Sequence, residues 1–169
     1  DILQRRGYKF PQGKWISGVK GLWDFFCVIT LLYFPIKPRT RIPEAREVED
    51  CDLHFRKGLS AVHVNSRRFL LESLPIVRMF LAWDLRGIPQ SLEWVLISCT
   101  GFNVAGFSSI AVKMLERAKH ISDTTESNAL DLAVAEITLA VNMGSWGSVP
   151  DLDESMVNTA LGKGDLYKL

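Results

Sequence analysis

The chain has 169 residues, of which 47% are apolar and 23% charged, so it is long enough to bury one sizeable core and too apolar to be disordered. Its cysteines, Cys27, Cys51 and Cys99, are widely spaced and fit neither a disulfide framework nor a zinc motif, which favours a reducing compartment. The longest apolar run, residues 22–34, contains Asp24 and falls short of the roughly 20 residues that span a bilayer. There is no signal-peptide pattern either, so we expect a soluble or peripheral protein.

The net charge of +1 conceals an uneven distribution along the chain. Residues 1–86 carry 15 Lys and Arg against 9 Asp and Glu, a net charge of +6, whereas residues 87–169 carry 5 against 10, a net charge of −5. This division predicts a basic face for an anionic partner and favours end-to-end stacking of identical copies. A chance distribution of charge over a solvated surface is the alternative.

The N-terminal part combines basic side chains, aromatic side chains and closely spaced glycines over residues 1–21. Because glycine at this density disfavours a helix, we expect an arm that docks on a partner. Residues 22–34 are rich in aromatic and β-branched side chains and are followed by Pro35 and Pro38. That composition predicts a largely buried strand that ends at the prolines.

A helix is predicted from about Glu44 to His63, because apolar residues recur there at steps of three and four. Pro43 would lie near its first turn, where a missing N–H costs little, and Glu44 would lie at the positive end of the helix dipole. The next segment, residues 67–85, is apolar on nearly all sides and contains Pro75. We expect a buried helix that is kinked or restarts at Pro75, with a helix followed by a strand as the alternative.

Residues 92–100 are predicted to form a strand that turns Trp94 into the core. Residues 103–121 are ambiguous, because their first half is strand-like and residues 114–120 are helix-like. Apolar and polar side chains alternate in places over residues 130–143, which predicts an antiparallel strand.

Toward the C-terminus, Asp151 or Asp153 could cap a short helix that runs through Leu161. Taken together, the elements predict the α+β class. In this prediction residues 1–21 form the basic arm, and residues 22–169 form a single domain in which an antiparallel sheet packs against two or three helices.

The sequence contains no complete catalytic motif. The stretch GFSSI lacks the second glycine of a nucleophile elbow, and ALGKGD lacks the upstream glycine and the Ser or Thr of a phosphate-binding loop. Cys51 and His54 have a spacing found in metal sites, but no second pair follows, and Cys27 with His63 or His120 would be a nucleophile and base without a surrounding motif. We therefore expect no enzymatic activity, no cofactor and no metal.

Basic patches at the N-terminus and at either end of the predicted 44–63 helix are candidate binding surfaces. Phosphate contacts and base stacking would bind a nucleic acid. Charge with inserted Trp and Phe would bind an anionic membrane, and an acidic protein surface is a third alternative. Ordinary solvated loop charge explains each patch taken alone. The candidate residues are Arg5, Arg6, Lys9, Lys14, Trp15, Lys20, Lys37, Arg39, Arg41, Arg67 and Arg68.

The order of these segments resembles the middle of rhabdovirus matrix proteins. The stretch FFCVITLLYF at residues 25–34 precedes the amphipathic helix, then VNSRRF, then the apolar LPIVRMFLAWDLRG, then IPQSLEWV. Animal-virus members of that family have a similar series that ends in a closely spaced proline, leucine and tryptophan, which Pro89, Leu92 and Trp94 match. The resemblance covers residues 25–97, and the small size and mild net charge look more like a plant-infecting member.

Two features of the animal-virus proteins are absent from this sequence, a Pro-Pro-x-Tyr budding motif and a lysine-dense tail. Because the first residue is Asp1 and not Met, we expect the sequence to begin inside a longer gene product, and both features could lie upstream. The resemblance implies a structural protein without catalysis, which condenses the helical nucleocapsid and links it to the membrane envelope during assembly and budding. A nucleic-acid-binding viral accessory module is the alternative.

The resemblance also implies partners and a location. The partners are further copies of the chain in a helical array, viral nucleoprotein–RNA, an anionic membrane and the viral glycoprotein. The location is the virion, between nucleocapsid and envelope, and the inner membrane face in the host cytoplasm. The basic candidates above would then bind membrane or nucleocapsid. The candidates for self-association are the turn residues Arg86, Gly87, Ile88, Pro89 and Gln90.

Overall fold

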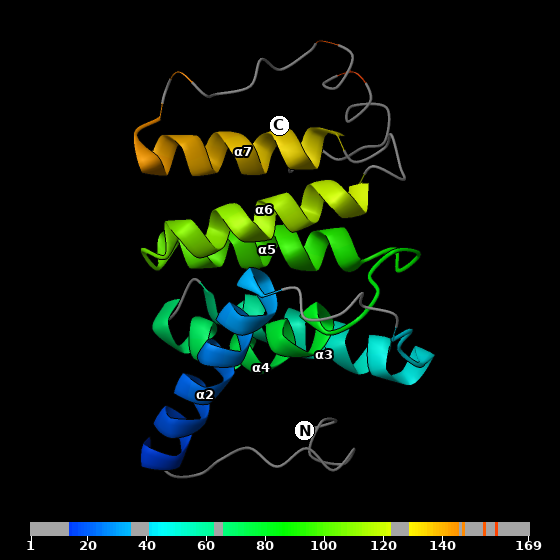
Figure 1. Ribbon diagram of the computed structural model, residues 1–169, viewed down its shortest axis with the longest axis vertical. Helices are drawn as coiled ribbons and strands as arrows, with labels where there is room; N and C mark the ends of the chain where they lie inside the picture. The colour runs from blue at the N-terminus through cyan, green and yellow to red at the C-terminus, as the bar shows by residue number, and fades with distance from the viewer. Residues whose placement is uncertain are drawn as a thin grey trace. The chain divides into compact units, whose positions relative to one another are not determined.

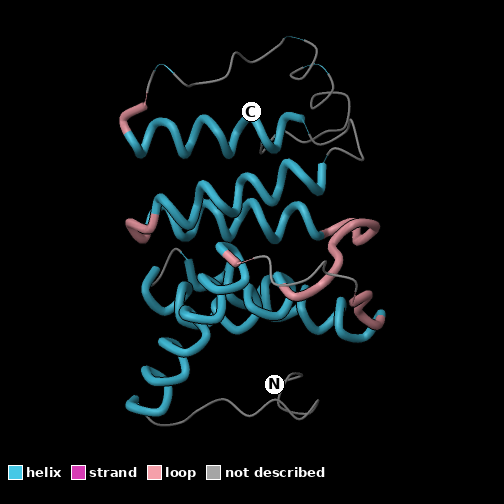
Figure 2. The backbone as a smooth tube through the Cα atoms, viewed as in Figure 1, coloured by secondary structure: helices cyan, strands magenta, loops and turns pink. Residues whose placement is uncertain are grey.

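The computed structural model describes residues 14–34, 41–62, 66–122 and 129–145, together with residues 147, 154 and 158. This described part contains helices and no strand, as Figures 1 and 2 show. The helices are α2 (Lys14–Tyr33), α3 (Ala45–Val62), α4 (Ser66–Leu81), α5 (Ser91–Val104), α6 (Ser108–Ser122) and α7 (Ala129–Met143). The predicted α+β class with an antiparallel sheet is therefore wrong.

Three segments expected as strands are helices. Residues 22–34 belong to α2 apart from the last, residues 92–100 lie within α5, and residues 130–143 lie within α7. Helix α5 is buried on almost every side, so its apolar residues are continuous along the sequence, as they are in a buried strand. In α7 the alternation is only local, because the buried Ala133 and Ala140 recur at the helical repeat of two turns.

Two predictions about helices are confirmed. The segment 44–63 forms α3, and most of the segment 67–85 forms α4. Helix α4 continues through Pro75, so it does not restart there. The ambiguous segment 103–121 contains the end of α5, a turn and most of α6, so its strand-like first half is also wrong. The short helix expected from Asp151 or Asp153 onward falls almost entirely outside the described residues.

The chain divides into two compact units, Asp1–Leu85 (unit 1) and Arg86–Leu169 (unit 2). This boundary nearly coincides with the division of charge. Unit 1 holds 14 Lys and Arg against 9 Asp and Glu, a net charge of +5, and unit 2 holds 6 against 10, a net charge of −4. Each unit therefore has its own packing and its own sign of charge.

In unit 1, α2 and α3 each pack against α4 (Figure 1). The core combines Val28 from α2, Phe55 from α3 and Phe80 from α4, all of them buried. A Cβ at Gly21 would lie 3.0 Å from Cδ2 of Leu71, so the missing side chain lets α2 approach α4 closely.

The basic arm predicted over residues 1–21 is wrong in its last part, because α2 begins at Lys14. Residues 1–13 lie outside the described residues. Glycine inside a helix costs roughly 1 kcal/mol relative to alanine. Packing of Gly21 on α4 and burial of Val28 offset that cost, which sequence propensity alone does not include.

The described part of unit 2 contains α5, α6 and α7, which lie alongside one another in Figure 1. Trp94 and Phe102 of α5 and Met114 of α6 are fully buried, which confirms the prediction that Trp94 faces a core. The Cys99 thiol donates a hydrogen bond to the carbonyl oxygen of Ala111 at 3.3 Å, so α5 and α6 are in close contact.

Candidate functional site

Most of the predicted anion-binding residues lie where the structure gives no side-chain position. Five of them are outside the described residues, namely Arg5, Arg6, Lys9, Lys37 and Arg39. The backbone of Lys14 and Trp15 belongs to α2 and that of Arg67 and Arg68 to α4, but their side chains are not described. Lys20 is exposed on α2 and Arg41 is exposed before α3.

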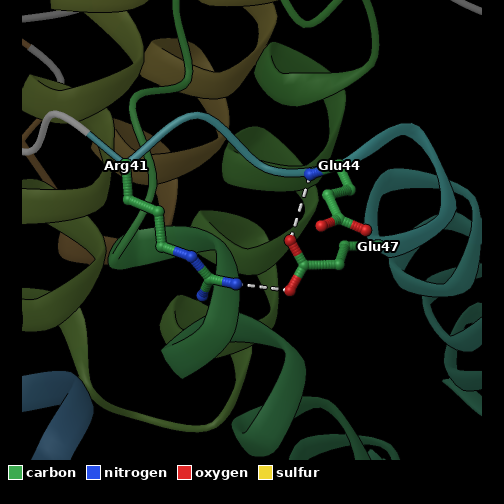
Figure 3. A network of polar contacts seen from close by, with 3 residues as sticks. All are labelled: Arg41, Glu44 and Glu47. Atoms are coloured by element: carbon green, nitrogen blue, oxygen red, sulfur yellow. Dashed lines mark hydrogen bonds and ion pairs between the residues drawn. The ribbon is translucent and has the colours of Figure 1, made fainter.

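Arg41 has a structural contact that the sequence did not reveal (Figure 3). Its Nη2 donates to Oε1 of Glu47 at 2.5 Å, and Oε2 of Glu47 accepts a hydrogen bond from the Glu44 backbone N–H at 3.1 Å. This is one half of a capping box, in which the third residue of a helix satisfies the N–H of its cap. The Arg41 carbonyl oxygen also accepts from the Asp84 N–H at 2.9 Å, so Arg41 ties the start of α3 to the end of unit 1.

The predicted self-association turn opens unit 2 directly before α5. Arg86, Gly87, Pro89 and Gln90 are exposed and Ile88 is half-buried. Gly87 has a φ of +86°, which lies in the left-handed region that favours glycine. The turn leads into a helix and not into the expected strand.

The outer face of α2 presents four large apolar side chains to solvent. The four are Val19, Leu22, Trp23 and Phe26, separated by steps of three, one and three residues, and each is between 60% and 71% exposed. Residues with this spacing share one side of an α-helix, so they form a continuous stripe, called here the α2 stripe. Contiguous exposed apolar surface of this kind marks an interaction site more often than scattered single residues do.

The inner face of α2 carries the only acidic residue of the helix. Asp24 is 1% exposed, and its Oδ1 lies 2.8 Å from Nη1 of Arg78 on α4. Gly21 and Val28 are buried on the same side. A surface helix normally turns its charges to water and its apolar residues to the core, so α2 has a buried carboxylate opposite an exposed apolar stripe.

The α2 stripe escaped sequence reasoning because residues 22–34 were interpreted as a strand. A signal was present in the spacing of residues 19, 22, 23 and 26, which a helix places on one side. The opposite face also carries apolar residues, so the segment lacks the polar face by which an amphipathic helix is usually recognised.

Two cysteines of the described part, Cys51 and Cys99, are buried. Burial raises the pKa of the Cys51 thiol to about 12, with a further rise from the charge of Asp52, and burial raises the pKa of Cys99 to about 11. Both thiols are therefore protonated and weakly nucleophilic at neutral pH. Nδ1 of His54 lies 2.8 Å from the backbone carbonyl oxygen of Asp50, within its own helix.

Within the described ranges, no group of three or more His, Cys, Asp or Glu side chains could hold a metal ion. None of the described helices combines the length and the apolar character needed to cross a membrane.

Comparison with known proteins does not identify the chain. No protein-family model matches it, and comparisons with curated proteins and with solved structures gave no match. The geometry of the chain itself is therefore the ground for a functional proposal.

Proposed function

We propose that this protein is a non-catalytic structural protein of the viral matrix type, which attaches to an anionic membrane surface through the outer face of α2. The observation that carries the proposal is the orientation of α2, whose apolar stripe is exposed while Asp24 is buried against α4. A helix of this kind can lie in the membrane plane with its apolar face in the headgroup boundary.

The energetics of insertion support peripheral attachment. Each large apolar side chain removed from water contributes about 1.5–3 kcal/mol, so the four residues of the α2 stripe supply several such increments. The indole of Trp23 suits the boundary between headgroups and acyl chains, because it is apolar with a polar N–H. No spanning segment is required for this mode of binding.

Charge favours an anionic surface over a neutral one. Residues 1–20 contain five Lys and Arg and one acidic residue, and α2 turns its own carboxylate, Asp24, toward Arg78. Each basic residue near an anionic membrane contributes about 1 kcal/mol of attraction, and salt weakens that attraction. The exposed Lys20 lies on the helix that bears the stripe.

The wider role follows from the same proposal. The partners would be further copies of the chain, viral nucleoprotein–RNA, an anionic membrane and the viral glycoprotein, with the protein between nucleocapsid and envelope and at the inner membrane face in the host cytoplasm. The opposite net charges of units 1 and 2 support contacts between unlike surfaces of successive copies, which give open helical arrays. The rhabdovirus resemblance stays a hypothesis, and two of the segments that carry it, residues 25–34 and 92–97, lie almost entirely in helices where strands were predicted.

The test is flotation with lipid vesicles, comparing phosphatidylserine-containing vesicles with neutral ones. The variant Leu22→Ser/Phe26→Ser removes half of the α2 stripe, and both side chains are largely exposed, so the fold should persist. Ile42→Ser is the matched control, because Ile42 is an exposed apolar residue of unit 1 outside the stripe. We expect at least a tenfold loss of vesicle binding for the double variant and no loss for the control.

A charge variant tests the other half of the proposal. Arg5, Arg6, Lys9 and Lys14 changed together to Glu should abolish the preference for anionic vesicles. Flotation of Leu22→Ser/Phe26→Ser at the wild-type level would contradict the role of α2. Binding of single-stranded RNA with a steep salt dependence, without vesicle binding, would favour the nucleic-acid-binding accessory module instead.

A further inference from the structure

The apolar surface of α2 continues past the α2 stripe to the end of the helix. Tyr33 is 41% exposed and Phe34 is 63% exposed. They follow Phe26 by seven and eight residues, about two helical turns, so they lie on the same side of α2 as the stripe. The Phe34 N–H donates to the Thr30 carbonyl oxygen at 3.0 Å, which holds Phe34 in the last turn. The long α2 face is the name used here for Val19, Leu22, Trp23, Phe26, Thr30, Tyr33 and Phe34.

Thr30 lies in the middle of the long α2 face and carries a hydroxyl group. Its Oγ1 donates to the carbonyl oxygen of Phe26, one turn earlier, at 2.9 Å. The hydroxyl proton is therefore satisfied inside the helix and needs no partner outside it. Polar groups without a partner are costly in an apolar medium, so this internal bond lets Thr30 enter lipid with its apolar neighbours.

Charged residues flank the long α2 face and do not interrupt it. Between Lys20 and Lys37 the sequence contains one charged residue, Asp24, which is buried against α4. Lys20 is exposed near the beginning of the face, and Lys37 follows Phe34 by three residues. At 1.5 Å per residue the face is about 22 Å long. The helix thus presents an uncharged apolar surface with a basic residue at either end of the segment.

We infer that α2 lies flat in the surface of an anionic bilayer and is embedded along the whole long α2 face. This inference rests on the proposed membrane attachment and adds Tyr33 and Phe34 to the binding site. An oblique helix would either leave Phe34 in water or pull Lys20 below the lipid phosphates. A flat helix does neither, because the basic residues at both ends stay at the level of the headgroups. The phenol of Tyr33 suits the same depth, since it is apolar with a polar O–H.

Charge and shape together favour a bilayer over a protein as the occupant. An acidic protein surface would have to present two anionic groups with an apolar strip of about 22 Å between them. An anionic bilayer presents phosphates above hydrocarbon at every point of its surface, so it matches both basic ends and the apolar face at once.

The test is the depth of a fluorescent label in vesicles, measured in a Cys27→Ser background. The other two cysteines are buried, so a nitrobenzoxadiazole label should attach only to an introduced cysteine. Val19→Cys and Phe34→Cys place the label at the two ends of the long α2 face. Ile42→Cys is the matched control, because Ile42 is an exposed apolar residue outside the face.

The vesicles contain phosphatidylserine and lipids with nitroxide groups on their acyl chains, which quench a label that enters the hydrocarbon. We expect quenching at residues 19 and 34 to agree within twofold and to be at least threefold stronger than at residue 42. A blue shift of the label at residue 34 in concentrated protein without vesicles would assign this end of α2 to a protein contact and overturn the inference.

Flotation of the same samples separates this inference from the proposed function. Vesicle-bound protein that is quenched at residue 19 but only to the control level at residue 34 would overturn the flat orientation and leave attachment through the α2 stripe intact. Quenching at residue 34 alone would overturn the flat orientation as well. Failure of the wild-type protein to float would overturn the inference and the proposed function together.

A second variant measures what the end of the face contributes to binding. Tyr33→Ser/Phe34→Ser changes two exposed side chains, so the fold should persist, and circular dichroism checks this. We expect at least a threefold loss of binding to phosphatidylserine-containing vesicles, and no loss for Ile42→Ser. Flotation of the double variant at the wild-type level would remove Tyr33 and Phe34 from the binding site.

Discussion

Replacing Arg78 by methionine keeps an extended side chain on α4 but removes the positive charge that lies 2.8 Å from Asp24. Asp24 is 1% exposed, and neither of its carboxylate oxygens has a hydrogen-bond partner among the described residues, because the contact with Arg78 is close without the alignment of a hydrogen bond. The ion pair is thus the main compensation for burying this carboxylate. Removing one partner of a buried pair costs about 3–5 kcal/mol. Arg78 is 42% exposed and partly hydrated, so we expect Arg78→Met to lower the free energy of unfolding by the lower value of this range, about 3 kcal/mol.

The reverse substitution should behave differently. Asp24→Leu removes the buried charge and leaves Arg78 with access to water. We therefore expect it to lower the free energy of unfolding by no more than about 1 kcal/mol, as for the loss of an exposed ion pair. The double variant Asp24→Leu/Arg78→Met retains neither charge, so its free energy of unfolding should be close to that of Asp24→Leu alone. The two single effects are therefore expected to be strongly non-additive.

The measurement is urea unfolding followed by far-ultraviolet circular dichroism for the wild type, both single variants and the double variant. A thermodynamic cycle then isolates the coupling between residues 24 and 78. An Arg78→Met variant within about 0.5 kcal/mol of the wild type would refute the reasoning, because differences of that size are usual for surface substitutions. A double variant as unstable as the sum of the singles would refute it as well.

Two further predictions concern the buried thiols and Trp94. Burial raises the pKa of Cys51 to about 12 and that of Cys99 to about 11, so the reactive thiolates form only as the pH approaches those values. At pH 8 a thiol reagent should therefore label at most Cys27 in the native protein. After unfolding it should label all three cysteines. Rapid native labelling of all three would contradict this burial. Trp94 is fully buried, so Trp94→Ala should lower the free energy of unfolding by about 3–5 kcal/mol, and a near-neutral result in urea unfolding would show that its packing is dispensable.

The prediction of secondary structure from the sequence was correct where a segment has one apolar and one polar side. Helix α3 is such a segment, since its apolar residues recur with the helical repeat on an otherwise polar sequence. It failed for α2, α5 and α7, whose composition is apolar on more than one side. In those segments the periodicity that separates helix from strand is weak, and β-branched and aromatic residues favoured the wrong element.

The candidate site shows the same limit. The basic residues before α2 were evident in the sequence, but Arg41 was grouped with them although it pairs with Glu47 at the start of α3. That pairing depends on the position of the chain before the helix, which a list of charges does not contain. The sequence contains the residues of the α2 stripe, but it does not show which apolar residues of α2 are exposed and which belong to the core. That distinction depends on which side of α2 another helix covers.

By itself the sequence determined the apolar segments and the turns between them, the helix over most of residues 44–63, the burial of Trp94 and the division of charge between the two parts of the chain. Only the tertiary structure decided which side of α2 is buried. The close approach at Gly21 and the ion pair of Asp24 with Arg78 turn that side toward α4, and the α2 stripe is left in water. The physical reason is that burial is a property of two surfaces in contact, so the partner helix selects which of two apolar faces joins the core and which becomes available for binding.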